Sequence, residues 1–101
     1  MIPANDVNPK AWSNKNILFD NGEYSVISGD YRDEGHCLGI RWNGEPGLSK
    51  GYPVQGKYPL WFVLPESIKT STLYSLKEKL LKLKYPGWKI HCDNILHEME
   101  K

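Results

Sequence analysis

Two turn signals constrain the fold of this chain more than any other feature. The first is the sequence DNG at 20–22, where the Asn-Gly pair tolerates the positive φ angles of a tight hairpin turn. The second is the sequence DEG at 33–35. Each turn lies between strand-like runs, so together they predict an antiparallel meander with strands over residues 17–20, 23–31 and 36–42.

The two turns also predict which side chains share a face of the sheet. A two-residue loop at 21–22 pairs Phe19 with Tyr24, and a three-residue loop at 33–35 pairs Val26 with Trp42. Because successive side chains of a strand alternate between faces, both turns predict the same apolar face. Its members are Ile17, Phe19, Tyr24, Val26, Leu38, Ile40 and Trp42.

The remaining elements complete an α+β fold. Residues 60–64 are apolar on both faces and predict a fourth strand, which Pro65 ends. Leucines at 73, 76, 80 and 83 recur at helical spacing, so a long helix is predicted within residues 67–85. We therefore expect a four-stranded, mainly antiparallel meander sheet with one long helix packed on the apolar face.

The chain length of 101 residues is typical of one domain, and we expect residues 1–101 to form one. Residues 1–16 are predicted to be an irregular N-terminal arm, which Trp12 pins to the body. The sheet then occupies residues 17–65 and the helix residues 67–85. For the secondary structure of the tail, residues 86–101, two alternatives stay open. One is an edge strand over 88–92, and the other is a short helix over 94–100.

Composition excludes some classes of function. A net charge of +1 argues against a protein that wraps duplex DNA, because such proteins carry a strong basic excess. No apolar run approaches the length of a membrane span, and the N-terminus lacks a signal-peptide pattern. We therefore expect a cytoplasmic protein with reduced thiols at Cys37 and Cys92 and no membrane partner.

Three motifs suggest chemistry that their context does not favour. Residues 51–57 match most of a phosphate-binding loop, but Tyr58 replaces the required hydroxyl residue and a strand follows in place of a helix. The pairs His36-Cys37 and His91-Cys92 offer soft metal ligands, yet neighbours on a strand point to opposite faces. A disulfide between the two cysteines is the other alternative. We expect no cofactor and no metal.

The sequence contains residues of the types that nucleophilic catalysis uses, but their spacing does not predict a catalytic site. Cys37 is a nucleophile, His36 or His91 is a base, and an aspartate, Asp30 or Asp93, could orient the base. Nothing in their spacing requires that they meet. We assign no catalytic residue, and a small enzyme of unknown class remains an alternative.

The second face of the sheet is the candidate for recognition. The predicted register sets Gly29 opposite Gly39, and paired glycines mark the close approach of another backbone, a ligand or a large aromatic ring. Tyr52 or Tyr58 from the loop at 43–58 is one such ring, and a partner is the alternative. The partner-binding residues predicted from this face and loop are Arg41, Tyr31, Tyr52, Tyr58 and Lys57, whereas Trp42 and Trp61 are assigned to the core.

The favoured function is non-catalytic recognition of a protein partner, which includes a second copy of the chain in a homodimer. The alternative is a single-stranded nucleic-acid-binding protein, because Tyr and Trp rings beside Arg and Lys stack bases and bind phosphates. The same predicted residues, with Lys50 added, would serve there. The lysines at 77, 79, 82 and 84 are interpreted as the solvated face of the helix and not as a nucleic-acid or membrane patch.

The segments LGIRWNG (38–44), GYP (51–53) and PLWFVLPE (59–66) carry a resemblance. Over residues 17–84 the chain is similar to small bacterial proteins that share an LGxRWN, GYP and PxWFVLP pattern and have no assigned activity. The resemblance implies a free-standing bacterial or mobile-element protein, and it transfers no functional residue.

Overall fold

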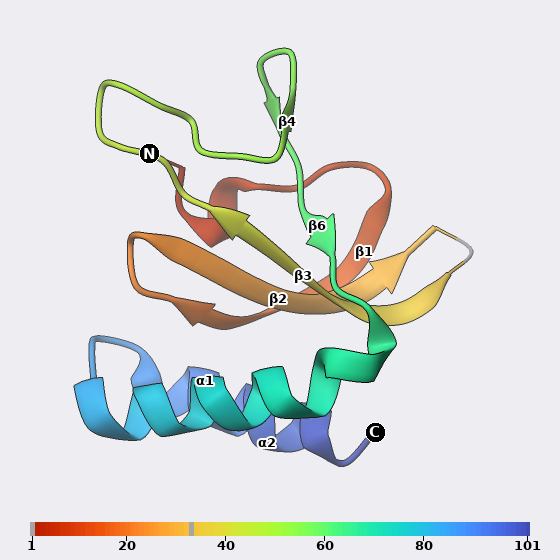
Figure 1. The fold of residues 1–101 in the computed structure, drawn as a ribbon, viewed down its shortest axis with the longest axis vertical. Helices are drawn as coiled ribbons and strands as arrows, with labels where there is room; N and C mark the ends of the chain where they lie inside the picture. The colour runs from red at the N-terminus through yellow and green to blue at the C-terminus, as the bar shows by residue number, and fades with distance from the viewer. Residues whose placement is uncertain (1, 33) are drawn as a thin grey trace.

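The computed structural model describes residues 2–32 and 34–101, which form a sheet layer and a helical layer (Figure 1). The main sheet is antiparallel with strand order β1-β2-β3-β6, and β4 and β5 form a separate small hairpin. The α+β class and the four-stranded antiparallel sheet are thus confirmed. The strands are β1 (Trp12–Asp20), β2 (Tyr24–Tyr31), β3 (Gly35–Trp42), β4 (Val54–Gln55), β5 (Tyr58–Pro59) and β6 (Phe62–Val63).

Two helices, not one, lie along one face of the sheet (Figure 1). A short 3-10 turn, η2 (Glu66–Ile68), leads into α1 (Lys69–Leu83), and α2 (Trp88–Met99) follows. Of the two alternatives for the tail, the edge strand over 88–92 is wrong, and the helix is present but begins at Trp88, six residues before the predicted start at 94. The tail is helical because its apolar residues recur at helical spacing toward the core. These residues are Trp88, Cys92, Ile95 and Met99.

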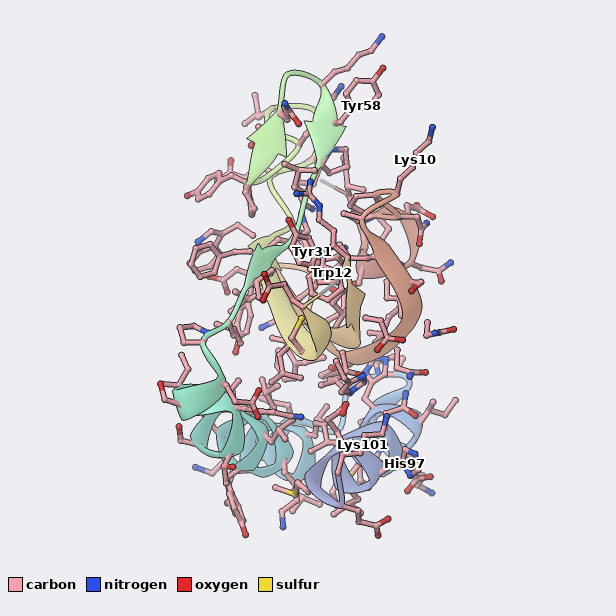
Figure 2. All side chains as sticks on the ribbon, turned by 90° about the vertical axis from the view of Figure 1, so that its right-hand side faces the viewer. Lys10, Trp12, Tyr31, Tyr58, His97 and Lys101 are labelled. Carbon is pink, nitrogen blue, oxygen red and sulfur yellow. The ribbon has the colours of Figure 1, made fainter. Side chains whose placement is uncertain are left out.

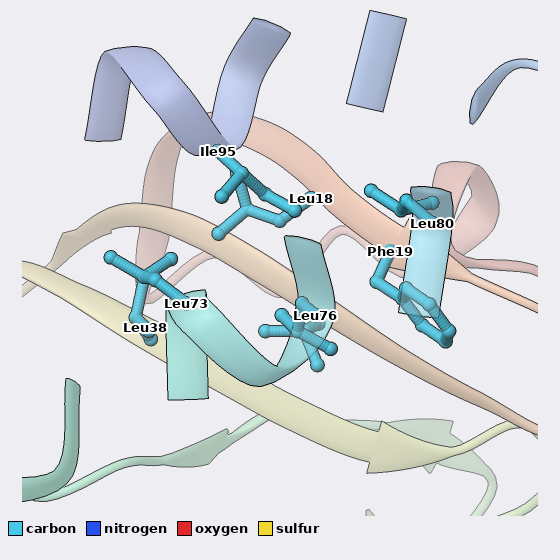
Figure 3. Packing of buried hydrophobic residues seen from close by; sticks show 8 residues of the cluster. Leu18, Phe19, Leu38, Leu73, Leu76, Leu80 and Ile95 are labelled. Carbon is cyan, nitrogen blue, oxygen red and sulfur yellow. The ribbon is translucent and has the colours of Figure 1, made fainter. Parts of the chain in front are cut away.

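The helix-side core forms where both helices meet the sheet, as Figure 3 shows. The helical leucines at 73, 76 and 80 are buried there, as their spacing predicts, whereas Leu83 is exposed. The complete set of buried residues is Leu18, Phe19, Val26, Leu38, Leu73, Leu76, Leu80 and Ile95.

The pairing of β1 with β2 differs from the prediction. Phe19 pairs with Val26 and not with Tyr24, because the turn is wider than a two-residue loop. The Asn21 side chain closes this wider turn by accepting the N–H groups of Glu23 and Tyr24, both at 3.0 Å. A bulge before Phe19 then places Leu18 in the helix-side core and leaves Ile17 against the opposite face.

The pairing of β2 with β3 is shifted by two residues. Tyr24 pairs with Trp42 and Ile27 with Gly39, so Gly29 faces Cys37 rather than Gly39. Part of the predicted turn, Asp33, lies outside the described residues. Because the shift is even, every side chain of β2 and β3 keeps its predicted face.

The opposite face of the sheet is covered by the N-terminal segment. β1 begins at Trp12, five residues before the predicted start, and a 3-10 turn, η1 (Ala4–Asp6), precedes it. The indole of Trp12, not Tyr52 or Tyr58, lies over both Gly29 and Gly39. The buried members of this opposite-face core are Ala4, Val7, Trp12, Ile27, Cys37 and Trp61.

None of the helices in the described residues is both long enough and apolar enough to cross a membrane.

The glycine at 39 is required by the indole above it. A Cβ atom at this position would lie 3.0 Å from Cη2 of Trp12 and 3.1 Å from Cβ of Trp61. We expect Gly39→Ala to lower the free energy of unfolding by about 1–3 kcal/mol, the cost of overpacking a core. Urea unfolding measures this change.

The double mutant supplies the control. In a Trp12→Phe background the ring is smaller, so Gly39→Ala should cost clearly less than in the wild type. An equal cost in both backgrounds would contradict the contact between Trp12 and Gly39.

Candidate functional site

An apolar groove opens on the helix side of the sheet, beyond the area that the helices cover. Its volume is about 680 Å³. Tyr24 and Trp42 form a cross-strand pair with ring centroids 5.9 Å apart, and Phe62 pairs with Ile40 in the next strand. We call this the aromatic groove, and define it by its lining residues Tyr24, Ile40, Arg41, Trp42, Tyr52, Pro53 and Phe62.

The connection from β3 to β6, residues 43–61, supplies one wall of the aromatic groove. It returns to the sheet where Tyr52 bridges Trp42 through two backbone hydrogen bonds of 2.8 and 3.1 Å. The return is so close that a Cβ at Gly51 would lie 1.9 Å from the Trp42 carbonyl oxygen. Gly51 also has a φ of +77°, which favours glycine. This backbone geometry places Tyr52 and Pro53 beside Trp42.

The rings of the aromatic groove are exposed to solvent. Trp42 is 47%, Tyr52 60% and Phe62 58% exposed. The groove continues into a second hollow of about 370 Å³ under α1, because Tyr24 and Ile40 line both. The α1 residues that face this hollow are mostly small and polar, Ser71, Thr72 and Ser75 among them. A contiguous exposed apolar surface of this kind marks an interaction site more often than scattered apolar residues do.

Arg41 lines the groove, but its guanidinium is buried beneath it. The side chain donates from Nε to the Leu60 carbonyl at 3.1 Å and from Nη2 to the Lys50 carbonyl at 2.7 Å. Nη1 lies 3.5 Å from the Ile2 carbonyl. Burial lowers the pKa of Arg41 from its ordinary value. Arg41 therefore holds the β3–β6 connection and the N-terminal segment in place.

The other predicted partner-binding residues do not form one site. Tyr52 lines the aromatic groove. Tyr31 packs against Trp12 on the opposite face, with ring centroids 5.1 Å apart. Tyr58, with the ammonium of Lys57 5.8 Å from its ring centroid, lies on the β4–β5 hairpin, away from Tyr31 and Trp12 (Figure 2).

The sequence prediction missed most of the groove. Trp61 is buried as predicted, but Trp42 is half exposed and lines the aromatic groove, so its assignment to the core is wrong. Alternation in the run Trp61-Phe62-Val63 could have identified Phe62, since burying Trp61 and Val63 on one face turns Phe62 to the other. Tyr24, Val26, Ile40 and Trp42 occupy alternate positions of two strands. This pattern also indicated an apolar face of the sheet that one helix would not cover completely.

A polar cluster ties α2 to the sheet. His36 of β3 lies between two carboxylates, with Nδ1 3.2 Å from Asp30 Oδ1 and Nε2 2.6 Å from Oε2 of the buried Glu98. The amide of Asn14 donates to Asp30 at 2.8 Å, and this bond, followed by that of His36, lowers the pKa of Asp30. The cluster connects β1, β2, β3 and α2, and it does not line the aromatic groove.

The two His-Cys pairs lie in different surroundings. Cys37 belongs to the opposite-face core and Cys92 packs on the helix-side core, so the sheet separates the two thiols. Burial raises the pKa of the Cys37 thiol. Over residues 2–32 and 34–101, no three His, Cys, Asp or Glu side chains are placed to hold a metal ion.

The partial phosphate-loop motif, residues 51–57, leads into the β4–β5 hairpin. Gly56 and Lys57 connect its two strands, and no helix follows the lysine. The helix N-terminus that phosphate binding needs is therefore not adjacent to the motif.

Comparison of the chain with protein-family models finds no match, and comparisons with curated proteins and with solved structures find none either. The resemblance based on residues 38–66 therefore stays a prediction.

The buried role of Arg41 can be tested by its effect on stability. We expect Arg41→Gln to lower the free energy of unfolding by about 3 kcal/mol, because carbonyl acceptors lose a charged donor in a buried place. Urea unfolding measures the loss. The exposed Arg32→Gln is the control and should change stability by less than about 0.5 kcal/mol. A fully stable Arg41→Gln would show that the guanidinium supports nothing in the fold.

His91 should make the fold sensitive to acid. Its Nδ1 lies within hydrogen-bond distance of the Tyr85 hydroxyl, at 3.2 Å, and burial lowers the pKa of His91 while Asp20 opposes the shift. The unfolded chain thus binds the proton more strongly. The stability from neutral His91 is complete above its ordinary pKa of about 6.5 and is lost as the pH falls from there through the lower folded pKa.

His91→Gln removes this titration but keeps an acceptor for Tyr85. We expect wild type to lose more stability than His91→Gln between about pH 7 and pH 5, as measured by urea unfolding at several pH values. His97→Gln changes an exposed histidine of the same helix and is the matched control. Parallel pH profiles for wild type and His91→Gln would refute the assignment.

Proposed function

We propose that this chain is a non-catalytic recognition domain that binds a protein partner through the aromatic groove. The observation that carries the proposal is the cluster of half-exposed rings of Trp42, Tyr52 and Phe62 around one hollow. Trp and Tyr are enriched among the residues that dominate binding energy at protein interfaces. Apolar side chains of the partner would enter the hollow and displace water from these rings.

The groove is rigid enough to be a preformed site. Trp42 and Tyr24 belong to paired central strands, and Tyr24 stacks on the buried Phe19 with ring centroids 5.1 Å apart. Phe19 in turn meets the ring of Tyr85 edge-on at 5.6 Å. Rings already held in place lose little conformational entropy when a ligand binds, which favours affinity.

Charge favours a protein ligand over a nucleic acid here. Among the described residues, Arg41 is the only charged one that lines the groove, and its guanidinium is occupied by backbone carbonyls. Single-stranded nucleic acids need cations along the phosphate path as well as rings on which bases stack. The rings of the groove lack such neighbours, so an uncharged, apolar peptide segment fits better.

Peptide display tests the proposal. Immobilised wild-type protein is used to select from a random dodecapeptide phage library, and we expect enriched peptides rich in aromatic and aliphatic residues. Synthetic versions are then titrated by fluorescence anisotropy. Phe62→Ser and Trp42→Ser should each weaken binding at least about tenfold, as expected for residues at the centre of an interface.

Tyr74→Ser is the matched control, because Tyr74 is 55% exposed but lies on α1 outside the groove. It should bind the peptides as wild type does. Failure to enrich any peptide, or equal binding by all four proteins, would refute the groove as the site. Salt-sensitive binding of an oligothymidine that Phe62→Ser abolishes would favour the nucleic-acid alternative instead.

A second copy of the chain is a specific case of the proposed partner. Sedimentation velocity over a range of protein concentrations tests it. Association of the wild type that Phe62→Ser abolishes and Tyr74→Ser keeps would identify the homodimer as the occupant of the groove. A monomer at every concentration would rule it out.

A further inference from the structure

Positive charge is concentrated in one short segment of this nearly neutral chain. Residues 79–92 hold four lysines and no Asp or Glu, whereas the other residues hold nine Lys and Arg against twelve Asp and Glu. A net charge of +1 therefore divides into +4 on this segment and −3 on the rest. Segregation on this scale creates a local positive field that the total charge hides.

The segment forms the turn between α1 and α2, at the end of the helical layer opposite the C-terminus (Figure 1). Lys84 adopts a left-handed conformation with φ of +47°, and its N–H closes α1 on the Leu80 carbonyl at 2.9 Å. Gly87, with φ of +87°, then starts α2. We call this region the lysine corner, and define it by Lys82, Leu83, Lys84, Lys89 and Ile90.

The lysine corner also exposes aliphatic side chains. Leu83 is 61% exposed and Ile90 is 68% exposed. Leu83 lies between Lys82 and Lys84 in the sequence, and Ile90 follows Lys89. The ammonium groups of Lys84 and Lys89 lie 5.6 and 5.8 Å from the ring centroid of the half-buried Trp88. The corner thus combines cations, a Trp ring and two large aliphatic groups on a projecting turn.

Acidic groups near the corner have other hydrogen-bond partners. The backbone N–H of Asp20 donates to the Tyr85 hydroxyl at 3.1 Å, and the Asp20 carboxylate accepts the N–H groups of Ala4 and Gly22 and the amide of Asn43. Nδ1 of His91 lies 3.2 Å from the Tyr85 hydroxyl. Glu78 and Asp93 flank the segment, but within the described part of the chain no ion pair involves a lysine of the corner.

In place of the solvated helix face to which the sequence assigned Lys82 and Lys84, we propose that the lysine corner binds the surface of a bilayer that contains anionic lipids, independently of the aromatic groove. Its lysines would lie among the headgroups while Leu83 and Ile90 enter the acyl boundary, which is how peripheral amphipathic segments bind membranes. A nucleic acid would gain less, because aliphatic groups do not stack on bases and the Trp88 ring already holds two ammonium groups.

Vesicle sedimentation tests the proposal with the intact chain. The probe is sucrose-loaded vesicles of phosphatidylcholine with 30% phosphatidylserine, compared with phosphatidylcholine alone, at about 0.1 M salt. We expect binding to the anionic vesicles only. Lys82→Gln/Lys89→Gln should weaken it about 25-fold, about fivefold for each lysine. Leu83→Ser/Ile90→Ser should weaken it at least about tenfold.

Matched variants separate the corner from general charge and hydrophobicity. Lys10→Gln/Lys57→Gln removes the same charge from exposed positions elsewhere, and Leu48→Ser removes an exposed leucine from the β3–β6 connection. Both should bind within about twofold of wild type, and circular dichroism confirms that every variant is folded. Binding by neither kind of vesicle, or an equal loss in the two lysine pairs, would overturn the proposal. Oligothymidine binding that depends on Lys82 and Lys89, without vesicle binding, would overturn it in favour of nucleic acid.

Discussion

The contact of Trp12 with the two glycines of the central strands is the constraint on which this fold depends. Both faces of the sheet need to be covered, and the two helices pack on only one of them. The indole of Trp12 reaches the backbone of the sheet because Gly29 and Gly39 have no side chain. The N-terminal segment can then complete the opposite-face core with few residues, and Trp61 joins it by donating Nε1–H to the Val7 carbonyl at 3.0 Å.

The helices cover one face of the sheet and the N-terminal segment the other, but part of the helix-side face stays uncovered. Tyr24 still borders the hollow under α1, whereas Trp42, its partner across the two strands, is half exposed. The β3–β6 connection borders that area with Tyr52 and Pro53 but does not close it. The aromatic groove thus lies where neither the helices nor the β3–β6 connection closes over the sheet, and Tyr24 of its lining stacks on the buried Phe19.

The sequence predicted the elements well where local rules decide them. Both hairpins, the strand before Pro65 and the leucine spacing of α1 followed from turn chemistry and periodicity. The predicted pairings were wrong because the side chain of Asn21 widens the first turn and because the second turn lies one residue earlier than predicted, so that Tyr31 pairs with Gly35. Tertiary contacts decided the rest. The bulge at Leu18, the buried position of Arg41 and the exposed position of Trp42 all depend on which segments pack where.

The anchoring of Arg41 has a consequence for how the groove moves. One guanidinium contacts carbonyls of Ile2, Lys50 and Leu60, and the Ile2 N–H donates to the Asn43 carbonyl at 2.9 Å. The start of the chain and the wall of the groove share these hydrogen bonds, so we expect them to unfold locally as one cooperative unit. Local unfolding of one exposes the amides of the other to hydrogen exchange. Any ligand that tightens Tyr52 against Trp42 thereby slows exchange at Ile2, a residue that does not line the groove.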